Sequence, residues 1–362
     1  MQRRQFLTAL GAGAAGAVAA PFVSTANAQE TVTWNMVTSW PKNFPALGTG
    51  ANDFAKRIET LSGGRMRVQV HGAGELVPAL EVFDAVAAGT AEMGHSAAYY
   101  WRGKVAAAQF FTAVPFGMNT AETNSWLYNG GGMELWDELY AKHNLKPLAV
   151  GNTGTQMAGW FKKEIHSLDD MQGLKLRLPG LAGEAMKGIG VTTVNMPGSE
   201  IFTSMQTGVL DAADWVGPYN DLAFGLHQVA DYYYTSAWNE PSAILEGTVN
   251  LDAWNALPDD LKAVVSEAAR SANLAMIDEF TYRNAQALKT LVDEHNVQLR
   301  SFPADVMQAL YESSQQVLQS QVDNDPDSRK IYESYREFQT LVRSFTDVGE
   351  FAYLKTRDAI SA

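Results

Sequence analysis

The 362-residue chain contains no cysteine, which excludes disulfide bonds, thiolate metal sites and cysteine nucleophiles. Basic residues are also few, because 27 lysines and arginines face 40 aspartates and glutamates. The formal net charge of −13 argues against nucleic acid and anionic lipid as partners, since both require a basic surface. An anionic ligand would need a local positive group in its binding site.

Histidine spacings typical of zinc sites and long apolar runs are absent as well. The six histidines form no HExxH pattern. After residue 28, no apolar run approaches the roughly 20 residues that span a bilayer. No general base with a separate acid partner can be assigned, so the sequence predicts a protein that is not an enzyme. The alternative is a metal-assisted lyase that uses the carboxylates described below.

The first 28 residues have the three parts of an export signal in order. Residues 3–7 (RRQFL) form a twin-arginine pattern, residues 9–20 are an apolar run rich in alanine and glycine, and residues 26–28 (ANA) suit a cleavage site. Removing residues 1–28 with their two arginines changes the formal charge from −13 to −15. We expect the mature chain in the periplasm, without direct membrane insertion.

Two segments of similar sequence suggest two similar halves: residues 81–97 (EVFDAVAAGTAEMGHSA) and 200–216 (EIFTSMQTGVLDAADWV). Each predicts a short helix that ends at a glycine, Gly89 or Gly208, because glycine adopts the left-handed conformation at little cost. A buried segment with a polar or aromatic tip follows in both. Two such α/β halves would form two lobes that enclose a cleft.

Hydrophobic periodicity extends this prediction along the chain. Alternating residues predict strands, and apolar residues three or four apart predict helices. The expected strands lie near 31–40, 65–70, 174–178, 192–195 and 209–213, and the expected helices near 47–61, 182–189, 200–207, 258–294 and 303–321. Asp325-Pro326 begins a further helix, with Asp325 as the cap and Pro326 in the first turn. The pattern predicts an α/β fold with long C-terminal helices.

The last of these helices carries Tyr332, Tyr335 and Phe338 at a spacing of three. Two interpretations remain open from the residues alone. The rings pack on their own lobe, or they form a dimer contact, since exposed aromatic patches usually mark interfaces.

Most candidate site residues lie in four segments of the second half: 151–156 (GNTGTQ), 173–179 (GLKLRLP), 210–218 (LDAADWVGP) and 237–241 (AWNEP). The first is expected where the chain crosses between lobes. In the second, strand alternation places Lys175 and Arg177 on the face opposite the leucines. From the residues alone, Arg177 could be a solvated charge and Trp215 an ordinary core residue.

Longer motifs resemble a known family. EIHSLDDMQGLKLRLPG and NMPGSEIFTSMQTGVLDAADWVGP resemble the signature of the periplasmic substrate-binding proteins of TRAP transporters. HGAGELVP, VPFGM, GNTGTQMAGWF and ADYYY are similar to the branch that binds 2-oxo acids such as pyruvate. The resemblance covers nearly the whole mature chain.

This resemblance implies a two-lobed periplasmic-binding-protein (Venus-flytrap) fold. Lobe I would comprise residues 31–152 plus about 243–285, and lobe II residues 153–242 plus about 286–330. Residues 331–362 would form a C-terminal helix that makes the protein a homodimer.

The resemblance also implies roles for individual residues. Arg177 would hold the solute carboxylate through two parallel hydrogen bonds, which lysine cannot provide. Trp215 would form a cleft wall that packs on the ligand. Tyr99, Tyr100 and Asn152 are further expected donors to the carboxylate or keto oxygen.

A metal cation, calcium or sodium, is implied beside the solute. Gln156, Asp214, Glu240 and the backbone carbonyl of Trp215 match the family's metal positions and supply the oxygen ligands that hard cations prefer. Gln156 alternatively contacts the solute. Asp214 stands where related sequences carry glutamate, which leaves the identity of the metal open. Taken alone, Asp214 would be a helix or turn cap and Glu240 a surface acid.

Charge balance favours calcium among the two cations. The net charge of the site is the sum of Arg177, one cation, Asp214, Glu240 and the solute carboxylate. This net charge is −1 with sodium and 0 with calcium, so calcium leaves less buried charge uncompensated.

The sequence therefore predicts an extracytoplasmic solute receptor of a TRAP-type, ion-gradient-driven transporter. It would bind a small 2-oxo monocarboxylate such as pyruvate with a metal ion and deliver it to the membrane permease subunits. Alternative cargoes are lactate, another 2-hydroxy acid bound as a metal salt, or a longer branched 2-oxo acid. An alternative role is that of a ligand sensor for a membrane signalling partner.

Overall fold

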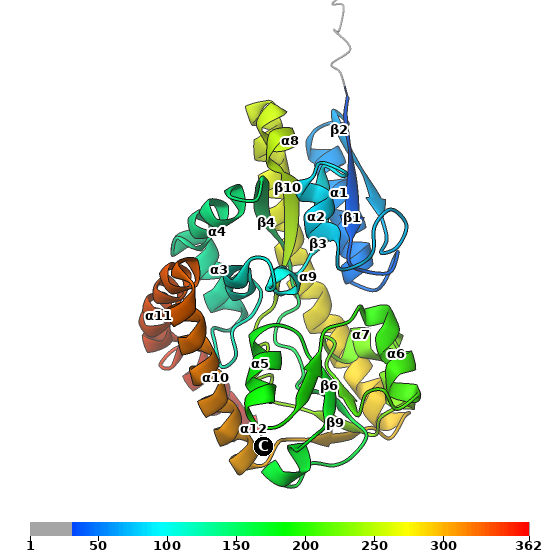
Figure 1. The fold of residues 1–362 in the computed structure, drawn as a ribbon, viewed down its shortest axis with the longest axis vertical. Coiled ribbons are helices and arrows are strands. Elements are labelled where there is room, and N and C mark those ends of the chain that lie inside the picture. The colour runs from blue at the N-terminus through cyan, green and yellow to red at the C-terminus, as the bar shows by residue number, and fades with distance from the viewer. Residues whose placement is uncertain (1–30, 362) are drawn as a thin grey trace, which may run out of the picture. The chain divides into compact units, whose positions relative to one another are not determined.

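The computed structural model describes residues 31–361. The export segment predicted at residues 1–28 lies outside the described residues. The described chain forms two mixed β-sheets, each covered by helices (Figure 1).

The first sheet has the strand order β2-β1-β3-β10-β4. Its strands are β1 (Val32–Thr38), β2 (Met66–His71), β3 (Met93–Ser96), β4 (Leu145–Asn152) and β10 (Ile244–Asn250). Strand β1 pairs in parallel with β2 and β3, whereas β10 lies antiparallel between β3 and β4. The alternation that predicted β1 places Trp34 and Met36 in the core beneath this sheet.

The second sheet has the order β11-β9-β5-β8-β6-β7. Its strands are short: β5 (Gly159–Phe161), β6 (Lys175–Arg177), β7 (Thr192–Val194), β8 (Ala212–Ala213), β9 (Tyr232–Tyr234) and β11 (Gln298–Arg300). Strand β6 pairs in parallel with β7 and β8, so the candidate Arg177 sits next to the loop that follows β8.

Helices cover both sheets and extend beyond them. The α-helices are α1 (Leu47–Leu61), α2 (Val82–Ala87), α3 (Thr120–Asn129), α4 (Gly132–Ala141), α5 (Gly180–Gly188), α6 (Gly198–Gln206), α7 (Pro218–Ala223), α8 (Leu251–Ala256), α9 (Asp259–Asp293), α10 (Ala304–Asn324), α11 (Pro326–Thr346) and α12 (Glu350–Ser361). Short 3₁₀ helices are η1 (Ala98–Trp101), η2 (Ala106–Phe111), η3 (Leu168–Met171) and η4 (Leu226–Gln228). These findings confirm the predicted α/β class with long C-terminal helices.

The two similar sequence segments form the same unit, one in each sheet. Helix α2 is followed by Gly89 at φ 73°, and α6 by Gly208 at φ 79°. Each glycine turns the chain into a buried strand, β3 in the first sheet and β8 in the second. Both strands end beside candidate site residues.

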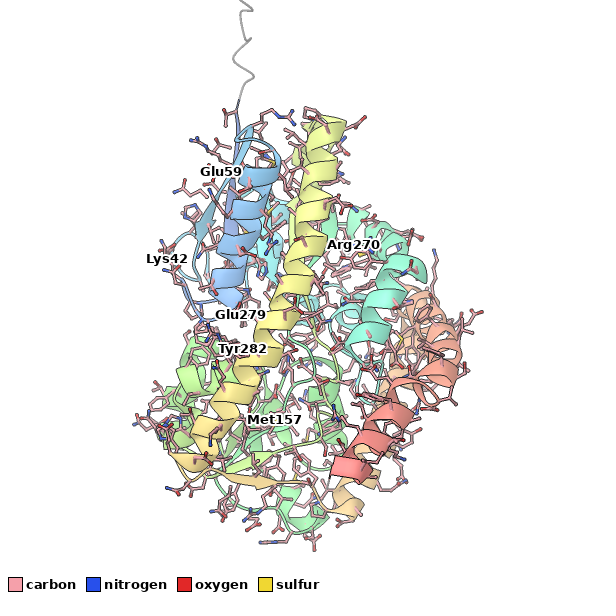
Figure 2. The ribbon with its side chains drawn as sticks, turned by 180° about the vertical axis from the view of Figure 1, so that it is seen from behind. Lys42, Glu59, Met157, Arg270, Glu279 and Tyr282 are labelled. Atoms are coloured by element: carbon pink, nitrogen blue, oxygen red, sulfur yellow. The ribbon has the colours of Figure 1, made fainter. Side chains whose placement is uncertain are left out.

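Three connections link the two sheets. Residues 153–158 lead from β4 to β5, residues 235–243 lead from β9 to β10, and α9 packs against elements of both sides. Figure 2, the view from behind, shows α9 as one continuous helix that runs in front of the two sides. Its residue Val265 lies in the core of the first sheet, whereas Phe280 and Leu291 lie in a cluster shared by the two sides.

The aromatic residues of α11 lie mostly in the core. Tyr332 and Tyr335 are buried against Phe110 and Trp126, and the Tyr335 hydroxyl accepts a hydrogen bond from the Met118 backbone N–H at 2.6 Å. The interpretation as packing within the chain is thus correct for these two rings. Exposed apolar side chains occur further along α11, in α12 and in the turn between these helices, namely Leu341, Phe345, Val348, Phe351, Tyr353 and Ile360.

Candidate functional site

Arg177 is fully buried at the end of β6, which rules out the solvated surface charge considered from the sequence. Its Nη1 donates to the Asp214 carbonyl at 2.8 Å, its Nη2 to the Tyr100 hydroxyl at 3.3 Å, and its Nε to the Met196 carbonyl at 3.3 Å. A guanidinium has five N–H groups, so one remains on each terminal nitrogen. Two such donors on one planar group suit a carboxylate.

Trp215 covers this guanidinium. The Arg177 guanidinium carbon lies 5.2 Å from the centroid of the Trp215 ring, which is a cation–π distance. The ring rests on Gly198 at the start of α6, where an added Cβ would come within 2.4 Å of the indole. Trp40, Phe44 and Phe224 surround its remaining edges. Trp215 is therefore both a packed residue and a wall beside Arg177.

Two acids lie buried beside the arginine. Asp214 precedes Trp215, and its backbone N–H donates to the Arg177 carbonyl at 2.9 Å. Burial raises the pKa of Asp214 to about 7, against the opposing effect of the Arg177 charge. Burial, followed by repulsion from Asp214, raises the pKa of Glu240 well above its ordinary value. Glu240 is only 2% exposed, so the alternative of a surface acid is wrong.

Gln156 joins these acids through the backbone, because its N–H donates to the Glu240 carbonyl at 3.2 Å. Gln156 Oε1, Asp214 Oδ2 and Glu240 Oε2 are buried and have no hydrogen-bond partner among the described residues. Buried oxygens without partners are costly. Two carboxylates and an amide oxygen form the donor set of a hard cation, so these residues fit calcium or sodium.

The remaining candidates come from the first sheet and its loops. Tyr100 contacts Arg177 directly. The ring of Tyr99 lies against Gly180 at the start of α5, and burial followed by the Glu240 charge raises the pKa of its hydroxyl well above the ordinary value. Asn152 is fully buried, but its amide donates to the Ser242 hydroxyl at 3.0 Å and accepts from the Gly154 N–H at 2.8 Å. Asn152 thus holds two of the crossings together.

Sequence reasoning missed two polar residues that support the site. The Asn239 amide donates to Asp214 Oδ1 at 3.3 Å, and its own Oδ1 is buried without a partner among the described residues. Asp221 accepts from the backbone N–H groups of Val216 and Gly217 at 3.2 Å, which fixes the loop after Asp214. The position of Asn239 beside Glu240 was the available signal.

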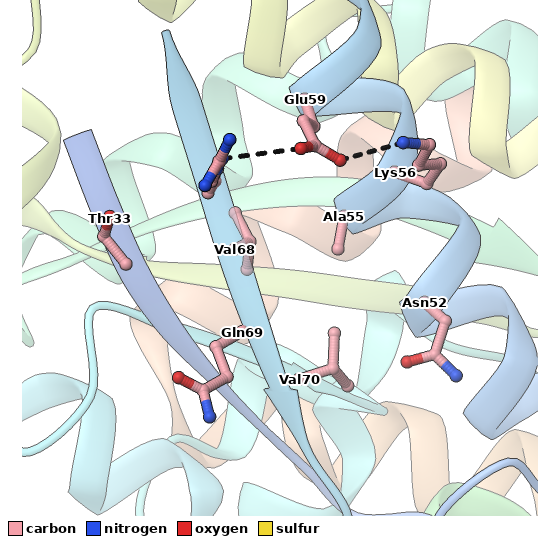
Figure 3. A pocket seen from close by; sticks show the side chains of 9 residues that line it. Thr33, Asn52, Ala55, Lys56, Glu59, Val68, Gln69 and Val70 are labelled. Atoms are coloured by element: carbon pink, nitrogen blue, oxygen red, sulfur yellow. Dashed lines mark hydrogen bonds and ion pairs between the residues drawn. The ribbon is translucent and has the colours of Figure 1, made fainter. Parts of the chain in front are cut away.

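A groove of about 430 Å³ elsewhere lacks these features. It lies between α1 and β2 (Figure 3) and is lined by Thr33, Asn52, Ala55, Lys56, Glu59, Arg67, Val68, Gln69 and Val70. Glu59 already pairs with Lys56 at 2.9 Å and with Arg67 at 3.5 Å. Its charged groups are satisfied by one another, so we place the site at Arg177 and Asp214.

A buried guanidinium with N–H groups left over, beside unpartnered oxygens, is an arrangement that suits a small carboxylate and a cation in a binding protein. A family model described as bacterial extracellular solute-binding protein, family 7 (DctP), matches residues 36–325. The chain therefore belongs to this family of bacterial extracellular solute-binding proteins. This membership confirms the predicted location outside the cytoplasm and the prediction that the chain is not an enzyme.

Individual relatives are similar over nearly their whole length. The monocarboxylate 2-oxoacid-binding periplasmic protein of Nostoc sp. is 39% identical over 360 residues, which cover 98% of each chain. The TRAP periplasmic solute binding protein of Pseudoalteromonas atlantica, solved with bound sodium and pyruvate, is 39% identical with a TM-score of 0.88, over 90% of this chain and 99% of that one.

Two further solved structures share the fold. The TRAP protein of Colwellia psychrerythraea, solved with calcium and pyruvate, is 38% identical with a TM-score of 0.88, over 90% of this chain and 100% of that one. The Bordetella bronchiseptica protein, a mixed-occupancy dimer with copurified calcium and picolinate, is 36% identical with a TM-score of 0.89, over 92% and 98%. These comparisons confirm the predicted family and fold.

Within residues 31–361, no helix combines the length and the apolarity needed to cross a bilayer.

Proposed function

We propose that this protein is the solute receptor of a TRAP transporter and binds a small 2-oxo monocarboxylate, such as pyruvate, together with calcium or sodium. The observation that carries the proposal is the buried fork of Arg177, with two N–H groups left, beside three buried oxygens without partners. A solute carboxylate and a cation would satisfy both sets. Relatives at 38–39% identity were solved with pyruvate and either sodium or calcium.

The solute carboxylate would lie on the terminal nitrogens of Arg177. Trp215 would cover it, and the Tyr100 hydroxyl, held by Arg177, would donate to it. Tyr99 and Asn152 are further proposed donors to the carboxylate or keto oxygen. Arginine suits this role because its charge survives complete burial and its planar fork presents parallel N–H groups to a carboxylate.

The cation would supply positive charge between the solute and the acids. Gln156, Asp214, Glu240 and the carbonyl of Trp215 are the proposed ligands. Calcium is favoured because Arg177 and a divalent ion together balance the two acids and the solute carboxylate.

The receptor must open before a solute enters, because Arg177, Asp214, Trp215 and Glu240 are each at most 3% exposed. We assign residues 31–152 and about 243–285 to one lobe, and 153–242 and about 286–330 to the other. Hinge closure of the two lobes would bury the ligand and complete the surface that the membrane permease subunits recognise.

We further propose export of the chain through the twin-arginine signal at residues 1–28 and a homodimer formed through residues 331–362. The exposed Leu341, Phe345 and Ile360 support this dimer contact, since they are 70–80% exposed on the last two helices. Replacing the exposed Leu341 and Phe345 with glutamate, which leaves the buried Tyr332 and Tyr335 in place, should halve the mass measured by sedimentation; an unchanged mass would refute the dimer proposal.

Calorimetric titration of metal-stripped protein with pyruvate, with and without calcium or sodium, tests the function. Binding that requires a cation is the expected result and identifies the ion. Pyruvate binding of equal affinity with and without cations would indicate that Asp214 and Glu240 have structural roles and are not metal ligands. Absence of pyruvate binding under every condition would refute the proposed cargo, and a parallel titration with lactate separates 2-oxo from 2-hydroxy acids.

A further inference from the structure

A loop of the first sheet enters an aromatic recess on the side of the second sheet. This loop, residues 40–46, joins β1 to α1. The ring of Phe44 stacks on Phe224 with centroids 4.2 Å apart and planes 27° apart, and it meets Trp215 edge-on at 6.3 Å. Phe44 is only 8% exposed as a result. Its ring therefore packs directly on residues of the other side.

The loop is also hydrogen-bonded across the same interface. The amide of Asn220, at the start of α7, donates to the Pro45 carbonyl at 3.0 Å. Asn220 is fully buried and Pro45 is partly buried, so this hydrogen bond is partly shielded from water. Ring stacking and a partly buried hydrogen bond thus connect the same loop to the second sheet's side at adjacent residues.

Trp40 holds Trp215 from a second direction. Its ring meets Trp215 edge-on at 6.2 Å, and its indole N–H donates to His95 Nδ1 at 2.7 Å. Because the indole only donates, Nδ1 must be the acceptor and a neutral His95 carries its proton on Nε2. Burial lowers the pKa of His95 to about 3, so the ring stays neutral and Trp40 stays fixed at neutral pH.

The backbone of the loop has a conformation that its residues rarely adopt. Asn43 and Ala46 have positive φ angles of 58° and 55°. Alanine at such a φ is uncommon, and strained backbone of this kind concentrates at functional positions. The loop is also closely packed against the start of α1, since an added Cβ on Gly48 would come within 2.6 Å of the Pro41 carbonyl oxygen.

We propose that Phe44, together with Trp40, is a positioning element that holds Trp215 over Arg177 and thereby sets how long a bound solute stays. We call Trp40, Phe44, Trp215 and Phe224 the aromatic clasp. The inference rests on the proposed function, because Arg177 and Trp215 are its solute contacts. The clasp exists only while the two sides are together, so separating them would return the Phe44 ring to water.

A different contact across the interface contributes less. Arg102 pairs with Glu184 between η1 and α5, but both side chains remain about a third exposed, and such ion pairs stabilise weakly. Re-exposing a phenylalanine is costlier and corresponds to a change of about 10- to 100-fold in an equilibrium. The clasp is therefore expected to contribute more to the stability of the closed form than this ion pair does.

The test compares Phe44→Ala, Phe44→Leu and Phe302→Ala with the wild type. Phe302 is a matched control, because it is 6% exposed and stacks on Tyr234 at 4.4 Å and 20°, entirely within the second sheet's side. Stopped-flow fluorescence would measure association and dissociation of pyruvate in the presence of calcium. Thermal unfolding would report the structural cost of each variant.

Phe44→Ala should raise the dissociation rate about 10- to 100-fold with association within about twofold, and Phe44→Leu should show a smaller rise. Phe302→Ala should lower stability and leave dissociation unchanged. Equal effects of Phe44→Ala and Phe302→Ala on dissociation, or no effect of Phe44→Ala, would overturn the proposal.

A second measurement separates failure of the clasp from failure of the proposed function. The chain has no cysteine, so spin labels can be attached specifically at two introduced cysteines, Gln69→Cys and Gln206→Cys. Pulsed electron paramagnetic resonance would then measure the distance between the two sides. Phe44→Ala should broaden this distance or lengthen it. If the wild-type protein binds no pyruvate, the proposed cargo is wrong. Independently of that result, identical label distances in the wild type and in Phe44→Ala would reject the clasp.

Discussion

Replacing Arg177 with lysine tests the planar fork separately from its charge. The guanidinium uses three N–H groups on Met196, Asp214 and Tyr100, and two remain for a solute. A lysine ammonium has only three N–H groups in total, so the same three protein acceptors would use all of them and leave none for the solute. At least one charge-assisted hydrogen bond is lost, which costs about 1.5–3 kcal/mol.

This loss corresponds to a Kd for pyruvate about 10- to 150-fold higher in Arg177→Lys. Calcium affinity measured without pyruvate should change less than about threefold, because the positive charge beside Asp214 is kept. Isothermal titration with pyruvate at saturating calcium, and with calcium alone, provides both numbers. Arg300→Lys is the matched control, since Arg300 pairs with Glu164 away from the site. A pyruvate Kd for Arg177→Lys within about threefold of the wild type would refute the reasoning.

Three further outcomes are expected. Glu246 is buried between Trp101 and Tyr140, and burial raises its pKa from 4.5 to about 7, so the free energy of unfolding of the wild type falls as pH rises from 4.5 to 7. In urea unfolding, Glu246→Gln should be as stable as the wild type near pH 4.5 and about 3 kcal/mol more stable at pH 8. A stability difference that does not change with pH would contradict this prediction. Burial raises the pKa of Asp214 to about 7 and that of Glu240 well above its ordinary value, so calcium must displace protons at low pH. Its affinity in calorimetry should therefore rise from pH 5.5 to 7.5, whereas a flat profile would argue against these acids as ligands. Asn239→Leu should weaken calcium about 10- to 100-fold by releasing Asp214 Oδ1, with Asn239→Asp as the conservative comparison, and unchanged calcium affinity would exclude this supporting role.

Long elements of the fold were predictable because their period repeats many times. The apolar stripe of α1 gave its bounds of Leu47–Leu61, and Asp325 caps α11 by accepting from the Ser328 N–H at 2.9 Å as expected. Strands β5, β9 and β11 have three residues each, too few to show alternation. Strand β10 inserts between β3 and β4 from far along the chain, a pairing that no local pattern specifies.

The candidate site was predictable where a motif carried it and not where packing decides. Alternation put Lys175 and Arg177 on one face, yet Lys175 is exposed and Arg177 is enclosed by Tyr100 from the other sheet. Nothing in the local sequence distinguishes these two environments. Asn239 and Phe44 were missed for the same reason, because their roles arise from contacts with segments distant in sequence.

Helix α9 has a mechanical consequence for any opening motion. At 1.5 Å per residue its 35 residues extend about 52 Å, and along this length it contacts α1 and β4 of the first side and α7 of the second. Long helices curve with radii of roughly 60–100 Å without losing hydrogen bonds. At a radius of about 80 Å, an arc of 52 Å turns through roughly 37°. The helix can therefore bend smoothly, like an elastic beam, when the two sides rotate apart. The bending would be spread over many residues, and the helix would exert a restoring force toward the closed form.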